Sequence, residues 1–445
     1  MTISHSSVDQ VASEDVASEG ELSECMSGLL SVMRASISVM SIVQRVYPVE
    51  GAQLDALVMH CDHARLVYNL GLEQRSWWTQ SRRHFRQKIN YVSQAADLTE
   101  ARREFDWLRA GSTVVQQGAL RDLDRAFTNF FARRAWYPTF KKRSNTRQGF
   151  VVRDLAARRV NRKWGEILVP KAGWVRFRIS RAWTDICAAT SARVAVTNGR
   201  WTVSLTTPPA VRKIPDTTAV VGIDRGVANS VATSDGRMFH APGLTAGEQT
   251  RFLALQQRLA RQQKGSANRE RTKAKLGRLR LRLADRRGDW IEQTTTALAS
   301  AYCAAAVEKL AIANMTRRAK PKPDPDRPGA FLPNGGRAKS GLNHAILSSC
   351  WGKFAQRLDH KMSVIVVSAA YTSQQCSNCG HTCPDNRDSQ AVFRCQGCGF
   401  EHHADTNAAI NIRDRAFIID HQPEGMSGDR VHQSRLRAAP TTSVP

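Results

Sequence analysis

The sequence predicts a multi-domain α+β protein, because three stretches of the chain carry three different patterns of apolar residues. Residues 53–140 show helical spacing, residues 150–215 show the alternation of short strands, and the chain from residue 218 onward mixes the two. A length of 445 residues allows roughly two to four domains. A hydrophobic content of 42% is sufficient for folded cores and too high for a disordered chain.

Both ends of the chain depart from these patterns. Residues 1–39 hold six acidic residues and one basic residue, Arg34, and we expect about the first 25 residues to be disordered. Met40 is an alternative start, and residues 421–445 are expected to form a disordered tail. The leader lacks the basic and apolar segments of a signal peptide. No run of about 18 apolar residues predicts a transmembrane helix. A cytoplasmic location is therefore expected.

The first half of the chain is predicted to contain a strand, a helical segment and a group of short strands. The first strand spans Ser41–Tyr47 and ends at Pro48. Within the helical segment, arginines alternate with aromatic residues, which suits nucleic-acid contacts as well as ordinary helix packing: Arg75, Trp77, Trp78, Arg82, Arg83 and Phe85. The later strands are expected to form a small β-barrel or sandwich: residues 167–169, 174–179, 193–196 and 201–205.

The second half is predicted to hold an α/β domain. A buried strand is expected over residues 219–224, with an antiparallel partner over residues 229–233. Residues 251–290 are expected to form a helical hairpin. The remaining expected elements are a mobile Pro- and Gly-rich loop at 319–340, a helix at 343–361 and a buried strand at 363–368.

The charge of the chain points to a polyanionic partner. The net charge is +26, and the predicted hairpin holds 13 Lys and Arg against three acids. Nucleic acid is the first candidate, because neutralising phosphates releases bound counterions. A ribosomal-type RNA binder and a membrane-surface protein are alternatives, but no lipid-anchor motif accompanies the basic stretches. Four hairpin residues are candidates for nucleic-acid contacts: Arg271, Lys273, Lys275 and Arg278.

Four cysteines predict a structural zinc site. They form two Cys-x-x-Cys pairs separated by 15 residues, with a glycine after each pair: Cys376, Cys379, Cys395 and Cys398. Two such pairs can supply four thiolates to one tetrahedral Zn²⁺, which leaves no open position for catalysis. Cys383 falls outside the spacing, and His402 and His403 are less favoured substitute ligands.

Three carboxylates stand in settings that suit a catalytic metal site. Asp224 ends a buried strand, Glu308 follows a small apolar run, and Asp405 comes directly after the cysteine pairs. Each alone could be a turn former or a helix cap. Together they offer the converging oxygen ligands that two Mg²⁺ ions need for phosphodiester hydrolysis.

These motifs, read together, resemble the transposon-encoded TnpB proteins and the related compact type V CRISPR effector nucleases. The resemblance covers about residues 40–415. Its most specific parts are Gly-Ile-Asp-Arg-Gly at 222–226, Val-Glu-Lys-Leu at 307–310, Thr-Ser-Gln-Gln-Cys-Ser-Asn-Cys-Gly at 372–380 and Asp-Thr-Asn-Ala-Ala-Ile-Asn-Ile at 405–412. Weaker matches are residues 45–48, 64–69, 138–141, 266–269 and 286–290.

The resemblance implies an RNA-guided DNA endonuclease. Its partners would be a guide RNA and target DNA, both as duplex and as displaced single strand, and no membrane. The catalytic ligands of two Mg²⁺ would be Asp224, Glu308 and Asp405, and one structural Zn²⁺ would be held by the four cysteines. The implied domains are a β-barrel wedge (40–55 and 139–217), an inserted helical recognition domain (56–138), an RNase H-like or RuvC nuclease (218–370 and 402–420) and a zinc ribbon (371–401).

The chain departs from the family pattern at several positions. Arg225 often has an apolar counterpart, residues 291–293 replace a basic stretch, His403 replaces an acid, and the acidic leader has no counterpart. No departure removes a carboxylate of the trio. The alternatives are a nuclease-dead RNA-guided repressor, an RNase H-fold DNA transposase and a plain zinc-ribbon nucleic-acid binder.

Overall fold

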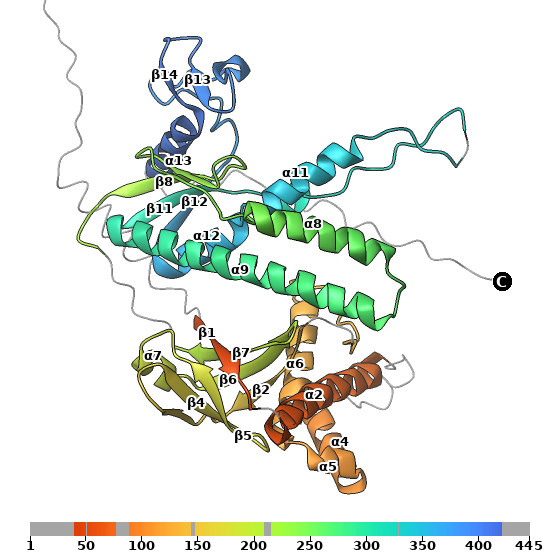
Figure 1. Cartoon of the computed structure of the whole chain (residues 1–445). Helices are drawn as coiled ribbons and strands as arrows, with labels where there is room; N and C mark the ends of the chain where they lie inside the picture. Colours follow the sequence, from red (N-terminus) through yellow and green to blue (C-terminus); the bar gives the residue numbers. More distant parts are fainter. Residues whose placement is uncertain are drawn as a thin grey trace, which may run out of the picture. The chain divides into compact units, whose positions relative to one another are not determined.

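A computed structural model describes residues 40–49, 51–76, 89–143, 147–208, 215–327 and 329–420. The acidic leader, the tail after residue 420 and the aromatic residues expected at 77–85 lie outside the described residues. The chain divides into two compact units (Figure 1). We call them the N-terminal unit, residues 37–211 and 244–282, and the C-terminal unit, residues 212–243 and 283–445 with the first 36 residues.

The N-terminal unit contains a seven-stranded antiparallel sheet. Its order is β2-β6-β7-β1-β5-β4-β3, so the first strand of the chain lies at the centre. The strands are β1 (Met40–Tyr47), β2 (Arg147–Arg153), β3 (Ala157–Arg159), β4 (Trp164–Val169), β5 (Gly173–Arg178), β6 (Ser191–Thr197) and β7 (Arg200–Thr207). The expected strands are confirmed, while β2 and β3 are additional. A closed barrel stays a prediction, because the sheet order places β2 and β3 at opposite edges.

Helices cover the β2 end of this sheet. The helices that lie wholly within the N-terminal unit are α2 (Ala52–Ser76), α4 (Tyr91–Glu104), α5 (Asp106–Ala110), α6 (Thr113–Phe131), α7 (Trp183–Cys187) and α8 (Ala246–Arg261). The helices α2 and α6 pack against each other and against β2. The predicted helical stretch was too long, since helix ends at Phe131 and Arg133 takes a left-handed φ of 55°. The basic hairpin is confirmed as α8 with α9 (Ala267–Ala301), which continues into the C-terminal unit.

The C-terminal unit is built on a five-stranded mixed sheet. Its order is β10-β9-β8-β11-β12, with β8, β11 and β12 parallel and β9 antiparallel to β8. The strands are β8 (Val220–Asp224), β9 (Val231–Thr233), β10 (Met238–Phe239), β11 (Ala304–Glu308) and β12 (Ser363–Val367). The expected strand and its antiparallel partner are confirmed. The strand β12 is not buried as predicted: it lies at the sheet edge, and Val366 is 55% exposed.

Helices lie on both faces of this sheet (Figure 1). Val221, Ile223 and Val307 pack with apolar residues of α9 and α12 (Trp351–Lys361). On the other face, Ala306 packs with Ile412 of α13 (Ala404–Asp420). Successive residues of a strand point to opposite faces, so Glu308 lies on the same side of β11 as Ala306. That side is covered by α13.

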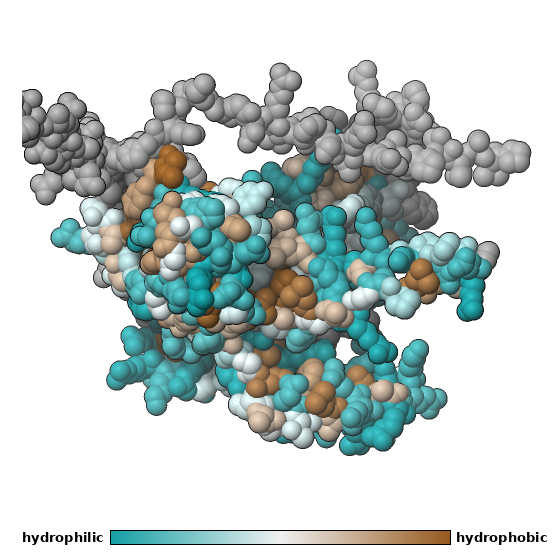
Figure 2. All heavy atoms as spheres, turned by 90° about the horizontal axis from the view of Figure 1, so that it is seen from above, coloured by the Kyte–Doolittle hydropathy of each residue, from teal (hydrophilic) through white to brown (hydrophobic). Residues whose placement is uncertain are grey.

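Shorter elements complete the C-terminal unit. They are α10 (Ile312–Met315), α11 (Gly336–Ser348), the 3₁₀ turn η1 (Pro384–Asn386), β13 (Val392–Arg394) and β14 (Glu401–His403). The helix expected at 343–361 is two helices, because Cys350 takes a left-handed φ of 61° between α11 and α12. No described helix is both long and apolar enough to cross a membrane. Hydrophilic residues cover most of the face drawn in Figure 2, and hydrophobic residues form small separate groups there.

The contact between β8 and α13 leads to a first prediction. A Cβ atom added at Gly222 would lie 1.9 Å from the carbonyl oxygen of Ala409, so an alanine forces the strand and helix apart. We expect Gly222→Ala to lower the free energy of unfolding by about 1–3 kcal/mol or more, as for other overpacked sites. Thermal unfolding measures this. Gly243→Ala is the control, since its Cβ would meet nothing within 4 Å. Equal melting temperatures for the two variants would contradict the prediction.

Candidate functional site

The three predicted carboxylates line one cavity of about 290 Å³ in the C-terminal unit. Asp224 is the last residue of β8 and Glu308 the last of β11. The register pairs Val307 with Ile223, so the two carboxylates end neighbouring parallel strands at the same sheet edge. Asp405 lies in the first turn of α13, which packs on both strands. The fold thus brings together residues that are up to 181 positions apart in the sequence.

Burial, together with mutual repulsion at Asp224, sets the electrostatics of this cavity. Removal from water and the charges of Glu308 and Asp405 raise the pKa of Asp224 to about 7. Burial also raises the pKa of Glu308, opposed by a hydrogen bond from the Thr372 hydroxyl to its carboxylate. Carboxylates held together against their repulsion in this way gain stability from bound divalent cations. The residues present therefore fit Mg²⁺.

Two arginines that the sequence analysis did not assign to the site also line the cavity. The Arg387 guanidinium donates to Asp405 Oδ1 at 3.2 Å, while Asn229 Nδ2 donates to Asp405 Oδ2 at 2.9 Å. Arg225 is buried and donates to the main-chain carbonyl of Glu308. The sequence showed Arg225 as a departure beside Asp224, but Arg387 stands in no local pattern that could have revealed it.

Asn386 holds Arg387 in place. It is fully buried, and its Nδ2 donates to the carbonyls of Gln374 at 2.9 Å and His381 at 3.2 Å. Its Oδ1 accepts a hydrogen bond from the backbone N–H of Gln396 at 2.8 Å. Gln374 and His381 flank the first cysteine pair, and Gln396 lies within the second. The position of Arg387 over Asp405 therefore depends on the fold of the cysteine-rich segment.

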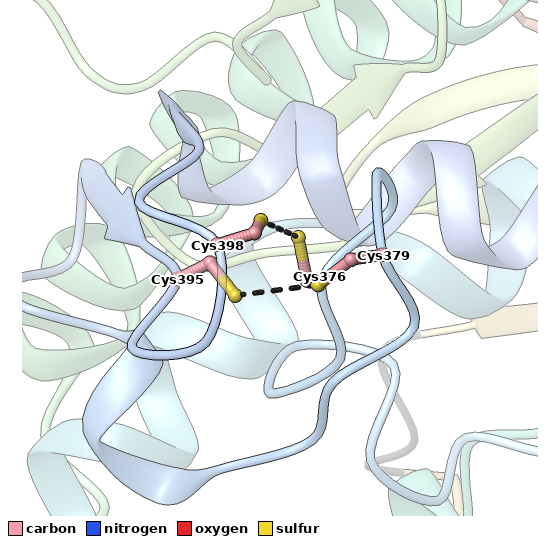
Figure 3. A group of neighbouring side chains, drawn as sticks. All are labelled: Cys376, Cys379, Cys395 and Cys398. Carbon is pink, nitrogen blue, oxygen red and sulfur yellow. Dashed lines mark hydrogen bonds between the residues drawn. The ribbon is translucent and has the colours of Figure 1, made fainter.

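The four predicted zinc ligands converge, as Figure 3 shows. Their sulfur atoms all lie within 4.8 Å of one another, with 3.8 Å between Cys376 and Cys398 and 3.6 Å between Cys379 and Cys395. Four sulfurs at about 2.3 Å from one tetrahedral zinc ion would be about 3.8 Å apart. The geometry therefore fits Zn²⁺.

The two cysteine pairs form matching turns. The N–H of Gly380 donates to the carbonyl of Cys376, and the N–H of Gly399 donates to that of Cys395. Both glycines have positive φ, 74° and 71°, which explains the glycine after each pair. Cys383 has no place in the four-sulfur cluster. His403, which the sequence offers as a substitute ligand, accepts a hydrogen bond through Nδ1 from the backbone N–H of Asp405 at 3.2 Å.

Two asparagines connect this segment to α13. Asn407 Oδ1 accepts from the N–H of Ser377 at 2.9 Å, and its Nδ2 donates to the carbonyl of Gln375 at 2.8 Å. Asn411, one helical turn later, donates to the carbonyls of Thr372 and Gln375. The Asp-x-Asn-x-x-x-Asn spacing is thereby explained: Asn407 and Asn411 share one face of α13 and anchor the chain that enters the first cysteine pair, while Asp405 lies on another side of the same helix.

The four candidate nucleic-acid contacts all lie on the part of α9 that belongs to the N-terminal unit. The neighbouring Leu276 and Leu279 are buried, whereas the four basic side chains are exposed: Arg271, Lys273, Lys275 and Arg278. Lys273 forms an ion pair with Glu270 at 2.6 Å. The positive charges of these four side chains are thus accessible from solvent.

Two family models match parts of the chain, and several curated relatives also match it. The model described as "Cas12f1-like, TNB domain" matches residues 351–412, and the one described as "Probable transposase" matches residues 193–319. The Escherichia coli K12 protein named "Putative RNA-guided DNA endonuclease InsQ" is 34% identical over 78% of this chain and 85% of its own length. The chain belongs to the TnpB family. A Streptomyces pristinaespiralis protein named "Putative RNA-guided DNA endonuclease" is 31% identical over 78% of this chain and 82% of its own length.

A solved structure aligns less closely. It is titled "Cryo-EM structure of the Cas12f1-sgRNA-target DNA complex", with 13% identity and a TM-score of 0.42 over 81% of this chain and 82% of that chain. The family membership therefore rests on the sequence relatives.

The cysteine cluster leads to a prediction about metal content. We expect about one zinc ion per purified chain, and its loss in the variant Cys376→Ser/Cys395→Ser, since metal binding and folding are coupled in such small sites. Elemental analysis measures this directly. Cys383→Ser is the matched control and should keep its zinc, because Cys383 lies outside the cluster. A zinc-free wild type, or zinc retained in the double variant, would refute the assignment.

Proposed function

We propose that the chain is an RNA-guided DNA endonuclease that cleaves target DNA at the cavity formed by Asp224, Glu308 and Asp405. The observation that carries the proposal is the convergence of these three carboxylates in a chain 34% identical to a relative named for this activity. In RNA-guided nucleases, the protein recognises the shape of the nucleic-acid backbone and a short motif beside the target. Base pairing with the guide RNA selects the target sequence. The guide RNA and the target DNA, as duplex and as displaced strand, are the proposed partners.

The carboxylates would hold two Mg²⁺ ions. When bound, such ions activate water and stabilise the leaving oxygen in phosphodiester hydrolysis. The chain itself contributes the orientation of the ligands: the Thr372 hydroxyl fixes the Glu308 carboxylate, and Asn229 fixes Asp405. Arg387 neutralises part of the negative charge of the trio through its ion pair with Asp405. A guanidinium at this position also suits contact with a substrate phosphate.

The domain arrangement implied by the family resemblance is part of this proposal. The five-stranded sheet with α13 would be the RNase H-like nuclease, the segment 371–401 the zinc ribbon, and the seven-stranded sheet the wedge. The helices within residues 56–138 would form the recognition domain. The zinc would be structural, because four protein sulfurs complete its coordination.

A DNA transposase is the second candidate, since one matching family model is described as "Probable transposase". The two activities leave different products. Hydrolysis gives free DNA ends, whereas strand transfer joins one DNA to another. Incubating the chain and its co-purifying RNA with a labelled target plasmid and unlabelled acceptor DNA distinguishes them, and joined products would favour the transposase.

The carboxylate trio is tested by substitution. Asp224→Ala, Glu308→Ala and Asp405→Ala are each expected to reduce plasmid cleavage in Mg²⁺ by about a thousandfold or more, because ligands of one site act as a unit. RNA binding should remain. Asp388→Ala is the control, as this exposed carboxylate beside Arg387 does not line the cavity. Near-normal cleavage by a trio variant would remove that residue from the assignment.

The hairpin is tested by salt dependence. Replacing Arg271, Lys273, Lys275 and Arg278 by Gln should weaken nucleic-acid binding, most visibly at low salt. Each lost phosphate contact should flatten the slope of log affinity against log salt by about 0.7–0.9. The choice of target sequence should not change, because base pairing with the guide RNA determines it. The variant Arg271→Lys/Arg278→Lys keeps the charge and should keep the slope. An unchanged slope and affinity in the Gln variant would mean that this face is merely solvated.

A further inference from the structure

The N-terminal unit holds a second cavity, of about 390 Å³, which is lined mainly by basic side chains. Two neighbouring strands form its floor. Arg147 and Gly149 lie two residues apart on β2, and Arg193 and Ala195 lie two residues apart on β6. Residues at this spacing share a face of the sheet. One face of the β2–β6 pair therefore presents two arginines around two residues with almost no side chain.

The missing side chains create the hollow. Gly149 and Ala195 are direct partners in the register of β2 and β6. A Cβ atom at position 149 would lie 2.5 Å from the carbonyl oxygen of Val194, so no larger residue fits without moving the strand. Cys61 and Arg65 of α2 form the opposite wall. The cavity is thus built into the packing of α2 on the sheet edge.

The cations of this cavity are not all neutralised. Arg193 binds both carboxylate oxygens of Asp122 at 2.7 Å, and Arg65 pairs with Asp62 at 2.9 Å. The other three lining cations are Lys141, Lys142 and Arg147. In the ranges that the structure describes, no carboxylate lies within ion-pair distance of these three. Their positive charge is therefore available to an anion from outside the chain.

Lys141 is held in place by polar and ring contacts; it forms no ion pair with any residue that the structure describes, although the nearby Asp122 carboxylate favours its charged form. The Asn69 side chain accepts from the Lys141 N–H at 2.8 Å and donates to the Lys141 carbonyl at 2.9 Å. The Lys141 ammonium lies 3.6 Å from the centre of the Tyr68 ring. Burial lowers the pKa of this lysine to about 8. A bound anion would offset the unfavourable burial of its charge.

We propose that this cavity, the Lys141 pocket, binds the phosphodiester backbone of a nucleic acid. The inference rests on the proposed function. Three available cations exceed the charge of one phosphodiester, and the volume exceeds one phosphate group, so the pocket fits consecutive phosphates of a strand. The ligand class is shared by guide RNA and target DNA, and the experiment separates these sources.

Binding of a single-stranded RNA and of a DNA duplex of the same sequence is measured against salt concentration, with the full chain. The test variant is Lys141→Met/Arg147→Gln. The matched control is Arg162→Gln/Lys163→Met, which removes the same two charges from exposed positions of the same unit, outside the cavity. The test variant should lose about tenfold or more in affinity, as for a lost hydrogen bond to a charged group. Its salt slope should flatten by about 0.7–0.9 per contact.

The outcome identifies the ligand. If the test variant loses affinity for RNA alone, the pocket binds the guide. If it loses affinity for the DNA duplex alone, the pocket binds the target. If it loses affinity for both, the pocket contacts the backbone of either. Affinities and slopes equal to those of the control for both probes would overturn the proposal. Such a failure would be separable from failure of the proposed nuclease, because plasmid cleavage depends on the carboxylate cavity of the other unit.

A footprint on the wild-type chain guards against a variant that fails to fold. Lysines are acetylated with and without each nucleic acid and read by mass spectrometry. Bound RNA or DNA should protect Lys141 several-fold more than Lys163. Equal acetylation of Lys141 in the free chain and in the chain saturated with nucleic acid would also overturn the proposal.

Discussion

The close packing of α13 on β8 is the constraint on which the carboxylate cavity depends. Gly222 allows the helix to approach until a Cβ there would overlap the carbonyl oxygen of Ala409. At that separation Asp405, in the first turn of α13, reaches the sheet edge where Asp224 and Glu308 end their strands. The same helix anchors the cysteine-rich segment through Asn407 and Asn411. One backbone contact therefore determines the position of both sites.

Charge balance explains the residues that surround the trio. Burial of Asp224 and the charges of Glu308 and Asp405 raise the pKa of Asp224 to about 7. The guanidinium of Arg387 and buried Arg225 offset part of this negative charge. Among the described residues, donor atoms form a tight cluster only at the four cysteines.

Regular local patterns were predictable from the sequence, and features set by distant contacts were not. The strand β8, the cysteine pairs and the helical hairpin carry their signal in adjacent residues. By contrast, β3 is Ala157–Arg159, which has no apolar alternation and is a strand only because it pairs with β4. The break between α11 and α12 depends on the left-handed backbone of Cys350, a residue type that does not mark helix ends. The positions of the four cysteines followed from spacing alone, whereas the roles assigned to the trio still rest on the family resemblance.

Arg387 shows why the cysteine-rich segment and the carboxylate cavity form one system. Its place over Asp405 depends on Asn386, which bonds to backbone beside both cysteine pairs. The sulfur atoms of those pairs lie close enough to share one metal ion. A closed four-sulfur site takes no part in chemistry itself. With a metal bound there, its contribution would be positional, because it would hold the loop that places the Arg387 guanidinium beside Asp405.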